Sequence, residues 1–127
     1  MAIKGASFAS FPDGQSVFGV GNGNLLQPIP IPDGYEACPA GAATVLGSSG
    51  AIGDYLESII IVPGTTSPGA VSIKDGAGTA ITIFTGGATS VADLKPFAVR
   101  LGIRATGAGW TITTGANVTA LASGLFT

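Results

Sequence analysis

The sequence predicts an all-β protein with a β-sandwich or jelly-roll-like body and an extended, Pro/Gly-rich N-terminal arm. Short segments in which apolar and polar residues alternate are typical of half-buried strands, and turn residues separate these segments at regular spacing. The 21 glycines and the frequent threonines disfavour long helices. The composition changes near Gly41, so we assign residues 1–40 to the arm and residues 41–127 to one sandwich domain.

Seven strands are expected after the arm, over residues 42–46, 54–62, 70–75, 79–84, 97–104, 109–114 and 117–122. Alternation is clearest in 97–104, where one face carries the apolar residues Phe97, Val99, Leu101 and Ile103. Phe84 breaks the alternation of 79–84. Trp110 shares a face with Ile112 and is therefore expected in the core. Residues 91–95 are the only segment for which we expect a helical turn.

The arm contains the segment Pro28-Ile29-Pro30-Ile31-Pro32, which can form neither a helix nor a central strand because proline lacks an N–H. Ordering about 40 residues costs on the order of 60 kcal/mol of conformational entropy, so an ordered arm needs a receiving surface. That surface is either the chain's own body or a neighbour, or else part of the arm is disordered when the protein is alone. The residues expected to bind a partner are Phe8, Phe11, Phe18, Ile29 and Ile31.

Charged residues make up only 9% of the chain, against about 25% in an ordinary domain. A surface this poor in charge indicates that neighbours cover much of it, so we expect a homo-oligomer and favour a trimer. Arg100 and Arg104 fall on one strand face, which is either a solvated face or a patch that binds acidic residues of a partner. The few cations are scattered, which disfavours nucleic-acid binding.

No enzymatic activity is expected, because the chain has no histidine to serve as a general base or a metal ligand. Asp54 and Glu57 are three positions apart in a strand and would face opposite sides, so we expect a turn-forming Asp54 and a solvated or salt-bridged Glu57. Cys38 has no neighbouring cation that would activate it and is expected to be a buried or interface residue. The glycines of 64–69 fit a turn better than a phosphate loop. We expect no cofactor and no metal.

The chain is expected to be synthesised in the host cytoplasm, because residues Met1–Lys4 lack the features of a signal peptide. The longest apolar run, Ile59–Val62, is too short to span a bilayer. We therefore expect no membrane partner.

Three stretches of the sequence resemble small structural proteins of tailed bacteriophage virions. They are Gly53-Asp54-Tyr55-Leu56-Glu57, the segment from Ser67 to Gly76, and the segment from Trp110 to Thr119. The resemblance covers residues 42–127 and implies a virion β-sandwich, which in some such proteins decorates or cements the capsid exterior as a trimer and in others sits on the tail.

Two functions follow as hypotheses. In the first, the chain is a decoration (cement) protein that binds the major capsid protein on the outside of the shell and stabilises it; the net charge of −2 suits the exterior better than the DNA-lined interior. In the second, it is a host-recognition module of a tail fibre or baseplate that binds a surface glycan, with Trp110 or Tyr55 as the aromatic contact. Both aromatic residues lie in strand patterns that favour the core instead.

Overall fold

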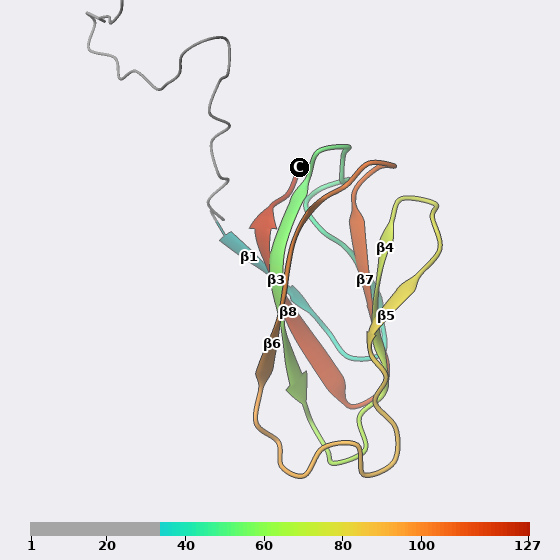
Figure 1. The fold of residues 1–127 in the computed structure, drawn as a ribbon, viewed down its shortest axis with the longest axis vertical. Helices are drawn as coiled ribbons and strands as arrows, with labels where there is room; N and C mark the ends of the chain where they lie inside the picture. Colours follow the sequence, from blue (N-terminus) through green and yellow to red (C-terminus); the bar gives the residue numbers. More distant parts are fainter. Residues whose placement is uncertain (1–33) are drawn as a thin grey trace, which may run out of the picture.

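The structure is a computed structural model that describes residues 34–127, and this part of the chain is built entirely of strands and loops. Eight strands form two antiparallel sheets of four strands each (Figure 1). The first sheet has the order β1 (Gly34–Cys38), β8 (Val118–Leu125), β3 (Tyr55–Pro63), β6 (Phe97–Arg104). The second has the order β2 (Ala43–Val45), β7 (Trp110–Thr114), β4 (Val71–Asp75), β5 (Ile81–Phe84). The predicted all-β class is confirmed, and the arrangement is consistent with a β-sandwich.

Within residues 34–127 no helix is long and apolar enough to cross a membrane. The sheets instead bury their apolar side chains against each other. The core comes from both sheets and includes Leu56, Ile59, Ile61, Val71 and Ile112, all fully buried. Trp110 is 4% exposed, and its indole Nε1–H donates a hydrogen bond to the Asp54 carbonyl oxygen at 3.1 Å. The prediction that Trp110 belongs to the core is therefore confirmed.

Each of the seven predicted strands is present, with ends shifted by up to three residues. The eighth strand, β1, spans Gly34–Cys38, where the sequence predicts the arm and no strand. All five residues of β1 pair with β8, from Gly34 opposite Gly124 to Cys38 opposite Ala120. Alternation of apolar and polar residues is absent here because β1 is an edge strand in which only Cys38 is buried.

The helical turn expected at 91–95 is wrong, since this segment is an irregular loop with a bend. Pro96 follows it, and a proline disfavours the helical conformation of the residue before it. The break at Phe84 has a different origin. The pairing of β4 with β5 shifts register between Val71 and Ser72, and this bulge lets both Ile83 and Phe84 pack against the core.

We predict that Trp110→Ala lowers the free energy of unfolding by about 3–5 kcal/mol, because it empties a large core site and removes the hydrogen bond to Asp54. Chemical denaturation measures the change. Ile52→Ala is the control: Ile52 is 69% exposed, and its loss should cost less than about 0.5 kcal/mol. Equal midpoints for Trp110→Ala and the wild type would contradict the core assignment.

Candidate functional site

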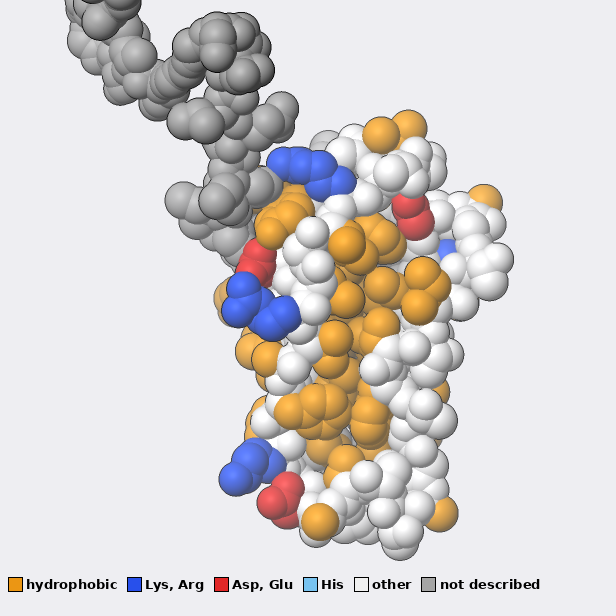
Figure 2. Space-filling model, viewed as in Figure 1, with side chains coloured by type: hydrophobic (Ala, Val, Ile, Leu, Met, Phe, Trp, Pro, Cys, Tyr) orange, Lys and Arg blue, Asp and Glu red, His pale blue; other side chains and the backbone are white. Residues whose placement is uncertain are grey.

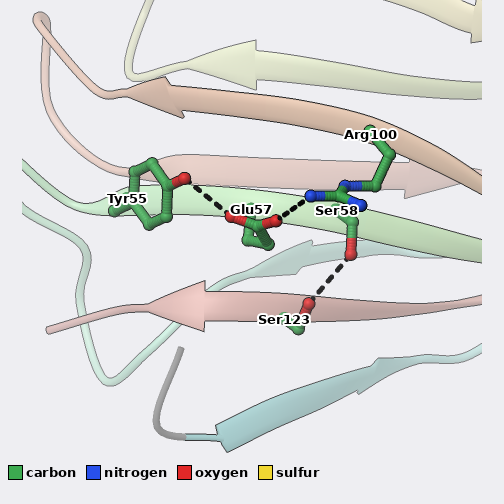
Figure 3. Close-up of polar contacts among 5 residues, drawn as sticks. All are labelled: Tyr55, Glu57, Ser58, Arg100 and Ser123. Atoms are coloured by element: carbon green, nitrogen blue, oxygen red, sulfur yellow. Dashed lines mark hydrogen bonds and ion pairs between the residues drawn. The ribbon is translucent and has the colours of Figure 1, made fainter. Parts of the chain in front are cut away.

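A chain of polar contacts lies on the outer face of the β1-β8-β3-β6 sheet, and we call it the polar cluster (Figure 3). The Tyr55 hydroxyl donates a hydrogen bond to Glu57 Oε1 at 2.6 Å, and Arg100 Nη2 donates to Glu57 Oε2 at 2.7 Å. Tyr55 and Glu57 belong to β3 and Arg100 to the neighbouring β6. Arg100 is the most solvent-accessible member, with a side chain that is 77% exposed.

A bulge in β3 brings these groups together. Leu56 pairs with Gly124 and Ser58 pairs with Ser123, so Glu57 is an extra residue without a partner on β8. The bulge directs Glu57 outward beside Arg100 while Leu56 and Ile59 remain buried. Next to it the hydroxyls of Ser58 and Ser123 are 3.0 Å apart (Figure 3).

The contacts shift the pKa values of both acidic members of the polar cluster. The hydrogen bond from Tyr55 and then the charge of Arg100 lower the pKa of the Glu57 carboxyl, which stays ionised. The same hydrogen bond raises the pKa of the Tyr55 hydroxyl. Arg104 lies over the Tyr55 ring, 5.4 Å from the guanidinium carbon to the ring centroid, and its Nη1 donates to the Gly53 carbonyl at 2.9 Å.

The polar cluster is equipped for binding rather than for acid–base chemistry. Glu57 is its one carboxylate, and both of its oxygens already accept hydrogen bonds. The described residues hold no group of three or more side chains suited to bind a metal ion. Tyr55, Glu57 and Arg100 line a shallow depression of about 320 Å³ together with Leu101 and Gly102. An aromatic ring, an anion and a cation lie side by side in this depression.

The second surface is apolar and lies where β5 and β6 form corresponding edges of the two sheets. The rings of Phe84 on β5 and Phe97 on β6 meet edge to face, 5.3 Å apart. Six side chains along these edges are only half-buried, and Ile81 is 57% exposed. We call the set the open flank: Ile81, Ile83, Phe84, Phe97, Val99, Leu101 and Ile103. In Figure 2 hydrophobic side chains form a band along the molecule between the two sheets.

One end of the open flank is hollowed. A cavity of about 600 Å³ is lined by Ile81 of β5 and Ile103 of β6, together with residues of the turns that follow β4 and β6. Asp75 connects these turns. Its carboxylate accepts hydrogen bonds from the backbone N–H groups of Thr106, Gly107 and Ala108 at 2.7–3.1 Å. These hydrogen bonds lower the pKa of Asp75 to about 2, and the bond from the Thr106 N–H has the largest effect.

The structure brings together the arginines that the sequence had placed on one face: Arg100 and Arg104 both project from the outer side of β6. Glu57 is salt-bridged and Asp54 forms a turn, as expected, and the two face opposite sides. The expectation that Tyr55 belongs to the core is wrong. The ring lies on the outer face because Tyr55 alternates with the buried Leu56.

Cys38 is buried, as the sequence indicated, and burial raises the pKa of its thiol to about 11. The thiol therefore stays protonated near neutral pH and is not a nucleophile. Residues 64–69 form an irregular loop with bends that leads into β4 and not into a helix, and Gly64 and Gly69 donate hydrogen bonds to the carbonyls of Asn117 and Ala116. The five arm residues predicted to bind a partner lie outside the described residues: Phe8, Phe11, Phe18, Ile29 and Ile31.

Two features of the surfaces were not predicted from the sequence. The polar cluster depends on a bulge, for which the non-alternating run Glu57-Ser58 was the only signal. The open flank depends on which strands are edges, and this is a property of the sheet order. Comparisons of the chain with protein-family models, with curated proteins and with solved structures found no match.

We predict that Asp75→Asn lowers the melting temperature at neutral pH, because an amide replaces the carboxylate that three N–H groups bind. The folded-state pKa of Asp75 is lowered from 3.8 to about 2, so its stabilisation is fully present above pH 3.8 and is lost as the pH falls through about 2. The difference in melting temperature between wild type and variant should therefore shrink between these two pH values. A difference that stays constant over this range would argue against the assigned role.

Proposed function

We propose that the chain is a non-enzymatic virion structural protein that binds the outside of a phage capsid and stabilises the shell. It acts as a decoration or cement protein and works by association alone. Added contacts across the junctions of capsid subunits oppose the internal pressure of the packaged genome. The resemblance of residues 42–127 to small virion proteins supports this proposal.

The observation that carries the proposal is the open flank on a chain with 9% charged residues. Contiguous apolar surface on a small domain marks an interaction site, because a free monomer gains nothing from exposing it. Elsewhere on the described surface, Ile52 at 69% and Leu94 at 50% add further exposed apolar area. A subunit of a large assembly covers such area with its neighbours.

The polar cluster suits the same role. Arg100 and Arg104 offer charged groups at the edge of the sheet, where they can pair with acidic residues of a partner. Such pairs contribute to orientation and specificity more than to affinity. The apolar contacts then supply the binding energy.

We predict that deletion of residues 1–27 leaves a folded β protein that binds capsids on the order of 100-fold more weakly, because it removes Phe8, Phe11 and Phe18 as apolar anchors. The eight strands of the two sheets begin at Gly34 and are left complete. Sedimentation with capsids of the encoding phage, stripped of this protein, measures binding, and circular dichroism checks the fold.

The full-length chain is the reference for both measurements. A folded deletion variant that still fills capsids at full occupancy would refute an attachment role for the arm. Binding would then have to lie on the body, with the face of Arg100 and Arg104 as the next surface to mutate. Aggregation of the variant would instead show that the arm completes the fold of the body.

A second function, recognition of a host glycan by a tail fibre or baseplate module, is favoured by one observation. The half-buried ring of Tyr55 lies beside Glu57 and Arg100 in the shallow depression. Arg104 lies over the ring, and the ring surface that Arg104 leaves free is where a sugar would stack. The second tyrosine, Tyr35, is 72% exposed on β1 of the same sheet and serves as a matched control.

We predict that Tyr55→Ala and Tyr35→Ala both retain full capsid occupancy in the sedimentation assay, because neither ring belongs to the arm or the open flank. Adsorption of virions carrying each variant to host cells tests the alternative. A loss of adsorption confined to Tyr55→Ala, with normal occupancy, would move the assignment to glycan recognition.

A further inference from the structure

The outer edge of β6 is the longest strand edge left without a partner among residues 34–127. β6 is the last strand in its sheet and runs over eight residues, Phe97–Arg104. Its inward row of Phe97, Val99, Leu101 and Ile103 is only half-buried. An edge of this kind, with free N–H and C=O groups beside uncovered apolar side chains, can receive a further strand.

The arm contains a segment whose prolines fit it for such an edge. Residues 25–32 have the sequence Leu-Leu-Gln-Pro-Ile-Pro-Ile-Pro, and we call them the proline segment. In a strand the N–H and C=O of one residue point to one edge, and those of the next residue point to the opposite edge. The prolines occupy even positions only, so the odd positions keep every donor along one edge. The proline segment can therefore pair on one edge and no other.

The side chains of the proline segment fit the open flank as well. Leu25, Ile29 and Ile31 share one face because they lie an even number of residues apart. Placed beside β6 with this face inward, they would extend the half-buried row of β6 toward Ile81 of β5. Eight residues at about 3.3 Å each match the length of β6.

The two isoleucines of the chain's own proline segment are too close to β1 to reach this place. Gly34 pairs with Gly124, Gly124 with Leu56, and Leu56 with Ile103, so a strand beside β6 lies four strand spacings from Gly34. Four spacings amount to about 19 Å. Ile31 is three residues before Gly34 and Ile29 is five before it, so their reach is at most about 11 Å and about 18 Å.

We propose that the open flank binds the proline segment of a second copy of this chain, which adds as an edge strand to β6. Each copy then gives one segment and receives another through different surfaces. Such a head-to-tail contact forms a closed ring when the rotation allows it, and a trimer is the smallest ring in which each copy meets two neighbours. This exchange of segments would produce the self-association that the proposed function requires. It rests on the proposed function only for its biological purpose, because its test needs no capsid.

The chain's own β1 edge is the competing receiver, because β1 is the strand that follows the proline segment directly in the sequence. The β1 edge offers little to the isoleucines, since Gly34, Tyr35 and Ala37 are exposed and Cys38 is the one fully buried residue of the strand. The open flank offers a continuous apolar row. We therefore favour β6 of the neighbouring copy.

Gln27→Pro and Leu26→Pro form a matched pair of variants in the full-length chain. Each adds one proline, but only Gln27→Pro removes an N–H from the pairing edge. Light scattering over a dilution series should show self-association about five- to tenfold weaker for Gln27→Pro and near wild type for Leu26→Pro. Equal effects of the two variants, or a monomeric wild-type chain at micromolar concentration, would overturn the proposal. If the contact were purely hydrophobic, Gln27→Pro would self-associate more strongly than Leu26→Pro, because Gln27→Pro makes the segment less polar.

Disulfide trapping between copies provides the second measurement. In a Cys38→Ala background, one tagged copy carries Ala98→Cys on the exposed side of β6, and a differently tagged copy carries cysteine at position 26, 28 or 30. We expect a covalent species that contains both tags for at least one position. Thr119→Cys, exposed on the interior strand β8, is the control and should give none. Links to Thr119→Cys alone, or none to Ala98→Cys, would overturn the proposal.

The deletion variants separate this inference from the proposed function. Deletion of residues 1–27 removes Leu25 and the Gln27 N–H but retains Ile29 and Ile31, so this variant should self-associate at least as weakly as Gln27→Pro, whereas deletion of residues 1–33 should give monomers. Self-association of the full-length chain without capsid binding would reject the capsid role and keep the exchange of segments. Capsid binding by a protein that never self-associates would do the reverse.

Discussion

One buried carboxylate organises the end of the molecule where the two sheets are joined. Asp54 is 4% exposed, and its side chain accepts hydrogen bonds from the Ala51 N–H and from the N–H and hydroxyl of Thr127. Its carbonyl accepts from the N–H of Ala105 and from the indole of Trp110. A buried carboxylate or carbonyl without these donors would be costly. The carboxylate therefore holds the loop before β3 to the residue Thr127 after β8, and the carbonyl holds the same loop to Ala105 after β6 and to Trp110 of β7.

With the strands held in this way, the chemistry of the two surfaces follows from the sheet order. β6 is an edge strand, and its alternation sends arginines to the outer face and apolar side chains to the open flank. The bulge at Glu57 adds a carboxylate beside Arg100. One strand thus borders both candidate surfaces. A polar contact on the outer face and an apolar contact on the flank can be made by different partners at the same time.

Alternating residues predicted the strands and the buried position of Trp110, because periodicity reports directly on which face meets the core. Alternation did not predict the strand Gly34–Cys38, because this edge strand pairs through its backbone and buries only one side chain. Alternation also led to the wrong prediction that Tyr55 belongs to the core, because Tyr55 follows the period of the strand but lies on its outer face. The pairing of Glu57 with Arg100 requires a register between strands 43 residues apart, which no local pattern contains.

As a decoration protein, the role that we propose, the chain would sit on the outside of a phage capsid. Negative-stain electron microscopy of intact virions, labelled with an antibody against the described body of the protein, tests this claim most directly. We expect label distributed over the whole capsid surface, at many sites on each particle. Label confined to the tail tip, fibres or baseplate would contradict it and would transfer the role to host recognition through the polar cluster.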